Sequence, residues 1–292
     1  MPTVTIIGAG RAGGALALAL IRAGVAVEQL VYHRMPPELF FDIPSNTKLS
    51  PWTELSGVDS DIAIIASADP EIRPIGESIS TFEKLPKIAL HLSGARDSNE
   101  LVSLRSKGVA VGSMHPLVSI SEPVLGSERF AGAYFCIEGD GMAVDTVRWL
   151  VEVLGGRHFA IATEHKPLYH ASAVMASGHV TALIDSAIGM LSACGLEEND
   201  AKKVLIPLIK STIANIEQQS SEQALTGPFA RGDAETVEKH LKAMEETVPD
   251  DIRQIYLDLG ERSVSILRTA SDDPAAFYDL ANLISMAKAQ GR

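Results

Sequence analysis

The sequence is poor in cysteine and in positive charge. Its 292 residues include two cysteines, Cys136 and Cys194, which are too few for a disulfide framework or a thiolate metal site. The 25 lysines and arginines face 37 aspartates and glutamates, and the formal net charge is −12. Nucleic acids and anionic membranes attract concentrated positive charge, so we expect neither as a partner.

Long apolar runs and a leader segment are also lacking. No apolar run approaches the ~18 residues that a membrane span requires. The chain starts almost at once with the strand-like VTII, without the charged and apolar zones of a signal peptide. Together with the scarcity of cysteine, this predicts a soluble, cytoplasmic protein. The length favours two domains.

The first half alternates short apolar runs with helical stretches. Helical patterns cover 12–23 and 144–154. Runs rich in Val and Ile predict buried strands at 4–8, 27–32, 61–67, 87–93, 108–114, 133–139 and 158–162. This alternation predicts an α/β Rossmann domain at 1–163, built on a mostly parallel, doubly wound sheet.

Beyond residue 163 the pattern becomes helical, and we expect an all-α domain at 164–292. Pro167 suits the first turn of a long helix, and Gly195 suits the stop that follows its end. The predicted helices are 167–194, 197–218, 234–246, 250–268 and 274–289.

A glycine-rich turn, GAGRAGGAL, follows the first predicted strand and opens a helix. Gly8 allows a tight turn, Gly10 lets the backbone approach a pyrophosphate, and Gly13 lets the helix lie close to the sheet. The N–H groups at the helix start, around Arg11 and Ala12, can hold phosphates. This context predicts a dinucleotide site.

The end of the second strand indicates which dinucleotide binds. NAD sites usually place a carboxylate there, but this chain reads Tyr32-His33-Arg34, and Glu28 lies too early. The guanidinium groups of Arg11 and Arg34 suit a 2′-phosphate. We therefore expect NADP, with His33 and Arg34 at the site. The alternative is that Arg34 is only a solvated loop residue.

Three further strand ends carry small or polar residues, namely ASADP (66–70), HLSGA (91–95) and SMHPL (113–117). The carboxyl ends of parallel strands face the ligand in such sheets. We expect Ser67 and Ala68 to contact the cofactor, and Ser93 and His115 to line the substrate pocket.

The stretch HKPLYHASAVMASGHV, at 165–180, opens the helical half. Lys166 and His170 fall one turn apart on a helix, with Tyr169 on the adjacent stripe. Lys166 is our candidate proton donor to a carbonyl oxygen, His170 can hydrogen-bond the same oxygen, and Tyr169 can line the pocket. The alternative is that Lys166 is a solvated residue at a helix start. Four histidines could be considered as zinc ligands: His158, His165, His170 and His179. A zinc site is disfavoured because their spacing does not put three of them on one helix face.

The segment ALTGPFARGD, at 224–233, interrupts the helical pattern with turn residues. Arg231 can bind a substrate carboxylate or phosphate, and Thr226 lies beside it as a second candidate ligand. Asp233 is better explained as the cap of the helix that starts at Ala234.

Taken together, GAGRAG, HLSGA, SMHPL, KPLYHASAVMAS and LTGPFARGDAETVEKHL resemble a family of Rossmann-like NAD(P)-dependent oxidoreductases whose C-terminal half was long catalogued as a domain of unknown function. The resemblance covers nearly the whole chain. More distantly, the layout is similar to the 6-phosphogluconate dehydrogenase-like superfamily, which includes 3-hydroxyisobutyrate dehydrogenases, pyrroline-5-carboxylate reductases, ketopantoate reductases and imine reductases.

This resemblance implies roles for several residues. Lys166 matches the lysine of the hydroxyisobutyrate branch, while His170 stands where that branch has Asn. Gly178 replaces an Asn expected in the nearer family. HLSGA would lie beside the nicotinamide. The helical domain would form a homodimer, whose second subunit can complete the pocket.

These observations predict an NADP-dependent oxidoreductase that transfers hydride between NADPH and a small carbonyl compound of the 2-oxo or 3-oxo acid type. Two alternatives stay open. One is a reductase of C=N bonds, like the pyrroline and imine reductases, and the other is a dinucleotide-binding sensor that does no chemistry.

Overall fold

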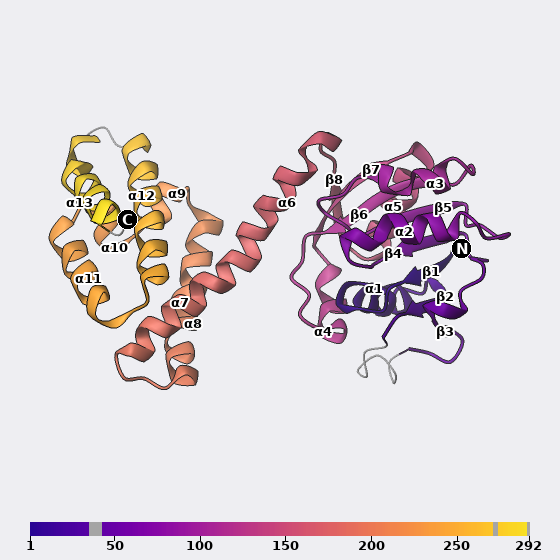
Figure 1. Ribbon diagram of the computed structural model, residues 1–292, viewed down its shortest axis with the longest axis horizontal. Helices are drawn as coiled ribbons and strands as arrows, with labels where there is room; N and C mark the ends of the chain where they lie inside the picture. The colour runs from indigo at the N-terminus through magenta and orange to yellow at the C-terminus, as the bar shows by residue number, and fades with distance from the viewer. Residues whose placement is uncertain (35–42, 271–273, 291–292) are drawn as a thin grey trace. The chain divides into compact units, whose positions relative to one another are not determined.

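The computed structural model describes residues 1–34, 43–270 and 274–290. They form two compact units, Met1–Ser177 and Gly178–Arg292 (Figure 1). Residue 163, the boundary expected from the sequence, marks the change from sheet to helix. The first unit also includes the beginning of the helix that follows.

An eight-stranded sheet forms the first unit, in the order β3-β2-β1-β4-β5-β6-β7-β8. Neighbouring strands are parallel except for β6 and β7, which are antiparallel. The strands are β1 (Thr3–Ile7), β2 (Ala26–Tyr32), β3 (Lys48–Pro51), β4 (Ile62–Ile65), β5 (Ile88–His91), β6 (Ala110–Pro116), β7 (Tyr134–Gly139) and β8 (Arg157–Phe159). The mostly parallel Rossmann sheet expected from the sequence is confirmed. The sequence missed β3, a four-residue edge strand without an apolar run.

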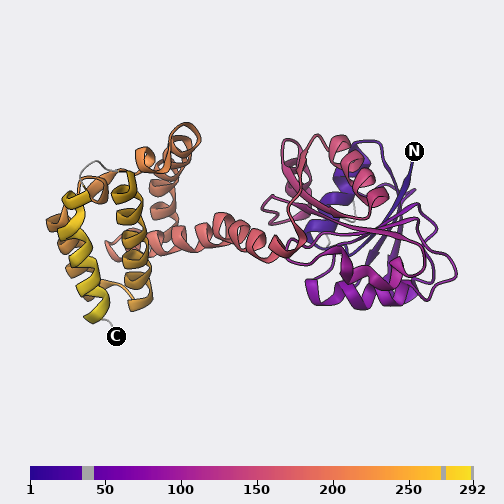
Figure 2. The same cartoon turned by 90° about the horizontal axis from the view of Figure 1, so that it is seen from above.

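Helices cover both faces of this sheet (Figure 2). They are α1 (Arg11–Arg22), α2 (Asp69–Ile79), α3 (Val102–Arg105), α4 (Pro123–Ser127), α5 (Gly141–Val153) and the start of α6 (Lys166–Val174). Because side chains alternate along a strand, each strand contributes residues to an apolar core on either face of the sheet. Ile64 and Leu90 pack on the face of α1 and α5, whereas Ile65 and Ala89 pack on the face of α2 and α3.

One row of side chains crosses the sheet on the α2 and α3 face, and it changes from apolar to polar residues along its length. Register pairs Val31 of β2 with Ile7 of β1, and Ile7 with Ile65 of β4. The same row then continues through polar residues on the next three strands: His91, Ser113 and Glu138. All three are buried or nearly so, and they need partners within the protein.

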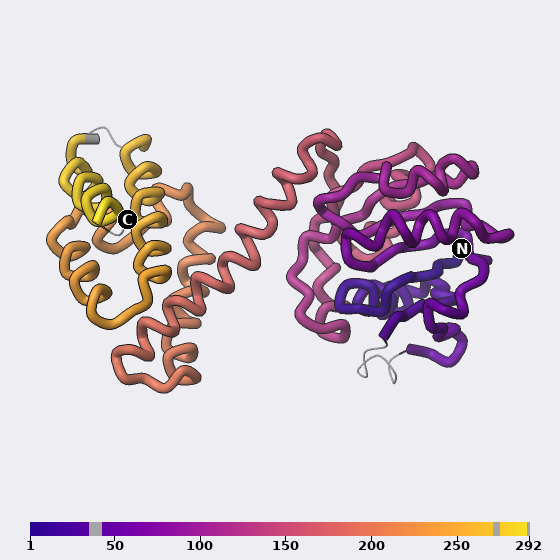
Figure 3. Tube along the Cα trace, in the orientation of Figure 1, coloured from indigo at the N-terminus to yellow at the C-terminus, as the bar shows by residue number. Residues whose placement is uncertain are grey.

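The second unit is entirely helical, as expected (Figure 3). Its helices are α7 (Val180–Ala193), α8 (Glu198–Gln218), α9 (Ser221–Ala224), α10 (Gly227–Ala230), α11 (Ala234–Thr247), α12 (Asp250–Ala270) and α13 (Tyr278–Gln290). The core lies between α11, α12 and α13, around Val237, Leu257 and Leu280. The predicted cap is confirmed, because Asp233 accepts a hydrogen bond of 3.0 Å from the Thr236 N–H.

The single helix predicted at 167–194 consists of α6, a π-helical turn at Met175–His179, and α7. A π-helical turn holds more residues than an α-helical turn, so this stretch is not one uninterrupted α-helix. The predicted ends are confirmed, since Pro167 lies in the first turn of α6, and Gly195, just past α7, has a φ of +98°.

The helical run Thr163–Ala193 is apolar over its length. Its mean hydropathy reaches 1.4 over an 18-residue window, none of which is buried, so by length and composition alone it could cross a membrane. The sequence analysis expected no run of this kind. Ser, Gly and Thr interrupt the apolar residues in the sequence, but they lower the average hydropathy only slightly.

Candidate active site

A cavity of about 600 Å³ opens at the carboxyl ends of β1, β2 and β4. This volume is within the range of roughly 300–1,000 Å³ that is typical of small-molecule sites. The predicted cofactor residues among its lining are Gly8, Gly10, His33, Arg34, Ser67 and Ala68. The sequence did not identify Trp52, which follows the missed strand β3, or Pro70, Glu71 and Pro74 of α2.

The backbone of the glycine turn has the shape that a dinucleotide requires. Gly8 has a φ of +112°, and a Cβ there would lie 2.6 Å from the carbonyl oxygen of Ala66. A Cβ on Gly13 would overlap the carbonyl oxygen of Gly8. By contrast, no heavy atom lies within 4 Å of a Cβ built on Gly10, so the space there is open for a phosphate.

The start of α1 also suits an anion. Gly10 is its N-cap and provides no side-chain cap, and the first turn holds no acidic residue. The positive end of the helix dipole therefore points toward the open space beside Gly10. Arg11, Ala12 and Gly13 lie in this first turn but are not among the described lining of the cavity.

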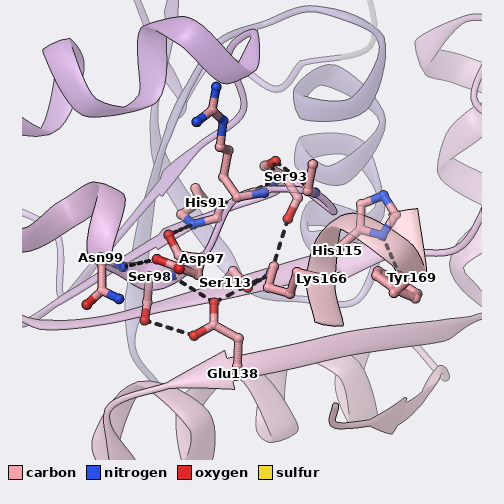
Figure 4. A network of polar contacts seen from close by, with 12 residues as sticks. His91, Ser93, Asp97, Ser98, Asn99, Ser113, His115, Glu138, Lys166 and Tyr169 are labelled. Atoms are coloured by element: carbon pink, nitrogen blue, oxygen red, sulfur yellow. Dashed lines mark hydrogen bonds and ion pairs between the residues drawn. The ribbon is translucent and has the colours of Figure 1, made fainter. Parts of the chain in front are cut away.

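The second part of the site begins at Lys166, whose side chain is only 1% exposed. Its ammonium donates to Ser113 Oγ at 2.6 Å, to the Ser93 carbonyl at 3.5 Å and to Glu138 Oε1 at 3.5 Å (Figure 4). These acceptors match the three N–H groups of an ammonium. The alternative that Lys166 is a solvated surface residue is therefore wrong.

Glu138 is held from its other side by the segment after β5. Its two carboxylate oxygens accept from the Ser98 N–H at 2.9 Å and the Ser98 hydroxyl at 2.8 Å. Arg105 reaches the same hydroxyl at 3.3 Å and binds both oxygens of Asp140 at 3.1 Å. The sequence analysis missed Glu138, although a lone carboxylate inside the apolar strand AYFCIEG was a usable signal.

The next polar row is formed by His115 of β6 and its register partner, Cys136 of β7. One turn along α6 from Lys166, Tyr169 lies with its hydroxyl 2.6 Å from His115 Nδ1. The ring of His170 meets that of His115 edge-on, with 5.7 Å between centroids. Lys166, Tyr169 and His170 thus use i, i+3 and i+4 positions to lie on two adjacent rows of the sheet.

Gly94 lies against both histidines. A Cβ built on it would be 2.7 Å from His115 Cε1 and 2.7 Å from His170 Cδ2. Ser93, predicted to contact substrate, is 8% exposed, and its hydroxyl accepts from the N–H groups of Ala95 and Arg96. The HLSGA segment is therefore a tight turn beneath the two imidazoles.

Burial sets the protonation of two histidines. Burial, followed by the charges of His170 and Lys166, lowers the pKa of His115 to about 4. Burial also lowers the pKa of His91, whose Nδ1 accepts from the Ser93 N–H while its Nε2 faces the Asp97 carbonyl at 3.0 Å. Both rings are therefore neutral at pH 7.

The structure does not test every predicted contact. Thr226 and Arg231 are exposed residues of the second unit, at either end of α10. The substrate role predicted for them stays a prediction, since each unit is described by itself. Within the described residues, no group of three or more His, Cys, Asp or Glu side chains could hold a metal ion.

These features define a class of protein. A Rossmann unit with a glycine turn and a cavity at its strand ends is followed by a helical unit, and the connecting helix contributes Lys166, Tyr169 and His170 to the sheet edge. Residues 133–263 match the family described as "Domain of unknown function (DUF2520)". This part of the chain is therefore similar to that family, in agreement with the resemblance seen in the motifs.

Solved structures show the same fold. A protein of Bacteroides fragilis, provisionally described as an NADP oxidoreductase, is 20% identical, and the match covers 90% of this chain and 97% of that one with a TM-score of 0.72. A protein of Thermotoga maritima is 21% identical, with 91% and 99% covered and a TM-score of 0.66.

A third similar structure is a reductive aminase from Aspergillus terreus in complex with NADPH and ethyl levulinate. It is 14% identical, with 98% of this chain and 99% of that one covered and a TM-score of 0.63. At these identities the likeness establishes the fold alone. The comparison with curated proteins found no significant match.

The buried Lys166–Glu138 pair leads to a prediction about stability. Lys166→Met leaves the Glu138 carboxylate, which is 10% exposed, without its cation, and should lower the free energy of unfolding by about 3–5 kcal/mol. The double variant Lys166→Met/Glu138→Gln should recover part of this loss. Urea unfolding followed by tryptophan fluorescence measures the free energy of unfolding of the first unit, because Trp52 and Trp149 both belong to that unit.

Lys84→Met is the matched control. Lys84 pairs with Asp59 on the surface, with exposures of 69% and 70%, and its loss should leave the unfolding midpoint unchanged. Equal effects of Lys84→Met and Lys166→Met would contradict the structural importance of the buried pair.

Proposed function

We propose that this protein is an NADP-dependent oxidoreductase that reduces a small carbonyl compound of the 2-oxo or 3-oxo acid type. One observation carries the proposal. The cavity at the glycine turn and the cluster of His115, Tyr169 and His170 lie at the carboxyl ends of neighbouring strands of one sheet, where Rossmann proteins bind dinucleotide and substrate side by side.

The preference for NADP rests on the end of β2. His33 and Arg34 are exposed there and line the cavity. A guanidinium group binds a phosphate through paired hydrogen bonds, so Arg34 would hold the 2′-phosphate while the start of α1 holds the pyrophosphate. The names of similar structures that mention NADP or NADPH support the same choice.

Bound NADPH would supply the hydride, and the residues of this chain would position the substrate and handle a proton. The sequence suggested Lys166 as the proton donor. With its ammonium enclosed by three acceptors, Lys166 would instead act through the network, by holding Tyr169 and His170 against the sheet edge. His170, which is half-buried, would pass a proton from solvent to the substrate oxygen.

Reduction of a C=N bond is a second candidate, and the burial of Lys166 favours it. A carbonyl must gain a proton on oxygen during reduction, whereas an iminium ion enters already protonated and leaves as a neutral amine. Enclosing the lysine therefore removes a proton donor that a carbonyl substrate needs and that an iminium substrate does not need. The likeness to the reductive aminase supports the same candidate.

We further propose that the protein is a homodimer through its helical part. Large apolar side chains of α7 and α8 are exposed: Leu183, Val204, Leu208, Ile213 and Ile216. An apolar surface of this kind on helices is unfavourable in water and marks a contact site. A second copy of the chain would cover it with an equivalent surface.

Our prediction for the cofactor is that NADPH binds at least about 10-fold more tightly than NADH, since one good phosphate contact is worth on the order of 1.4 kcal/mol. Fluorescence titration measures both dissociation constants. Arg34→Ala should weaken NADPH and leave NADH unchanged. Arg148→Ala is the control, because Arg148 pairs with Asp145 on the surface of α5 and is not part of the cavity lining. Equal affinities for the two cofactors in the wild type would exclude the NADP preference.

For activity, we expect the wild type to oxidise NADPH when it is screened against oxo acids and cyclic imines. His170→Ala should lower kcat on the order of 10²-fold, as for a lost proton donor, with little change in NADPH affinity. The screen is read as loss of NADPH absorbance. Tight NADPH binding without turnover of any substrate would instead support a non-catalytic sensor.

The expected assembly has a mass of 62.2 kDa, twice the 31.1 kDa of the chain. Light scattering over a range of concentrations measures it directly. Leu208→Asp should shift the protein toward the monomer, because a buried charge disfavours an apolar interface. A wild-type mass of 31.1 kDa at every concentration would rule out the dimer.

A further inference from the structure

His115 has one ring nitrogen committed and one available. Its Nδ1 lies 2.6 Å from the Tyr169 hydroxyl. The two rings meet edge-on at 85° with centroids 5.6 Å apart, and Phe159 packs edge-on against the other side of Tyr169. Nε2 lies on the far side of the imidazole from Tyr169, beside Gly94, where a Cβ would be 2.8 Å away (Figure 4).

The direction of the hydrogen bond follows from the surroundings. Burial, and then the neighbouring Cys136, raises the pKa of the Tyr169 hydroxyl, so it keeps its proton at neutral pH. Burial also raises the pKa of the Cys136 thiol, and a protonated sulfur is a weak acceptor. The better acceptor for the hydroxyl proton is His115 Nδ1, and the single proton of a neutral imidazole then resides on Nε2.

We infer that His115, held in its Nε2–H tautomer by Tyr169, is a catalytic residue that donates a hydrogen bond to the oxygen of the carbonyl group being reduced. Tyr169 is the positioning residue that fixes this tautomer. The inference rests on the proposed function, because the substrate bond is defined by that function.

The role of His115 is consistent with the balance of the reaction. Hydride addition from bound NADPH to the carbonyl carbon would move the π-electron pair onto the substrate oxygen and would leave NADP⁺. The Nε2–H group stabilises the charge that develops on this atom and keeps its own proton. The proton that completes the alcohol comes from solvent through His170, whose ring lies beside that of His115.

Burial is the main reason why His115 is neutral rather than cationic, and the charged and titratable groups around it contribute second. They come from every element packed against it: Asp69 of α2, His91 of β5, Cys136 of β7, and Lys166, Tyr169 and His170 of α6. The positive charge of Lys166 opposes protonation of the ring, and the negative charge of Asp69 favours it. The network that buries Lys166 thus also prevents His115 from taking up the second proton that would disturb its bond with Tyr169.

NMR tests the tautomer without any substrate. Long-range ¹H–¹⁵N spectra of the wild type at pH 7 should show His115 with a protonated Nε2 and an unprotonated Nδ1, and His115→Gln identifies its signals. Tyr169→Phe should give a mixture of tautomers. A protonated Nδ1 in the wild type, alone or together with Nε2, would overturn the inference.

The chain offers a matched control in a second His–Tyr pair. His240 Nδ1 lies 2.8 Å from the Tyr256 hydroxyl in the second unit. Tyr256→Phe should change the signals of His240 and leave those of His115 as they are. His240→Leu likewise serves as the kinetic control and should keep the wild-type kcat.

Kinetics tests the catalytic role on a substrate that the wild type reduces. His115→Leu should lower kcat by about 10²- to 10³-fold, as for one lost donor to a developing anion, while the dissociation constant of NADPH stays the same, which also shows that the variant is folded. His115→Gln keeps an N–H donor and should recover part of kcat. Tyr169→Phe should lower kcat less and alter its pH profile, because the tautomer of His115 is no longer fixed.

The proposed function and the role of His115 can be disproved separately. A wild-type protein that does not bind NADPH would overturn the proposed function, and the role of His115 with it. NADPH binding and turnover with an unchanged kcat in His115→Leu would overturn the role of His115 alone.

Discussion

The first unit depends on a single lysine ammonium that is buried at the edge of the sheet. Placing an unpaired charge there would cost several kcal/mol, so Lys166 requires the hydroxyl of Ser113, the carbonyl of Ser93 and the carboxylate of Glu138 around it. These acceptors come from the segment just after β5, from the middle of β6 and from near the end of β7. The lysine therefore fixes the first turn of α6 on three neighbouring parts of the sheet at once, and this contact sets the direction of the residues that follow.

One row of side chains across the sheet is apolar beside the cavity and polar beside α6. On β2, β1 and β4 the row is apolar and supports the glycine turn and its cavity. On β5, β6 and β7 it becomes His91, Ser113 and Glu138, and the last two bind Lys166 of α6. Because His115 stands two residues beyond Ser113 on the same face, the anchored helix brings Tyr169 and His170 to it. The proposed cofactor site and the proposed proton donor thereby share one support.

The likeness to solved structures extends over nearly the whole chain at about one residue in five identical. Such a fold tolerates wide change, because burial and strand register need only apolar residues in the right places. The site depends on individual side chains. A pair such as His115 and Tyr169 defines what this particular chain can do in a way that the shared fold cannot.

The sequence by itself determined the elements whose cause is local. The turn Gly8-x-Gly10-x-x-Gly13 is readable because only glycine fits at Gly8 and Gly13 while Gly10 leaves open space for a ligand, and the strands, the long helices and the Asp233 cap follow from periodicity and capping chemistry between near neighbours. Only the tertiary structure decided the role of Lys166. In the sequence it is a lysine at a helix start, the usual place of a solvated residue, and its acceptors lie 28, 53 and 73 positions away. The pairing of Glu138 with Ser113, and of His115 with Tyr169, depends in the same way on strand register and on the path of α6, which bring together residues that no local pattern connects.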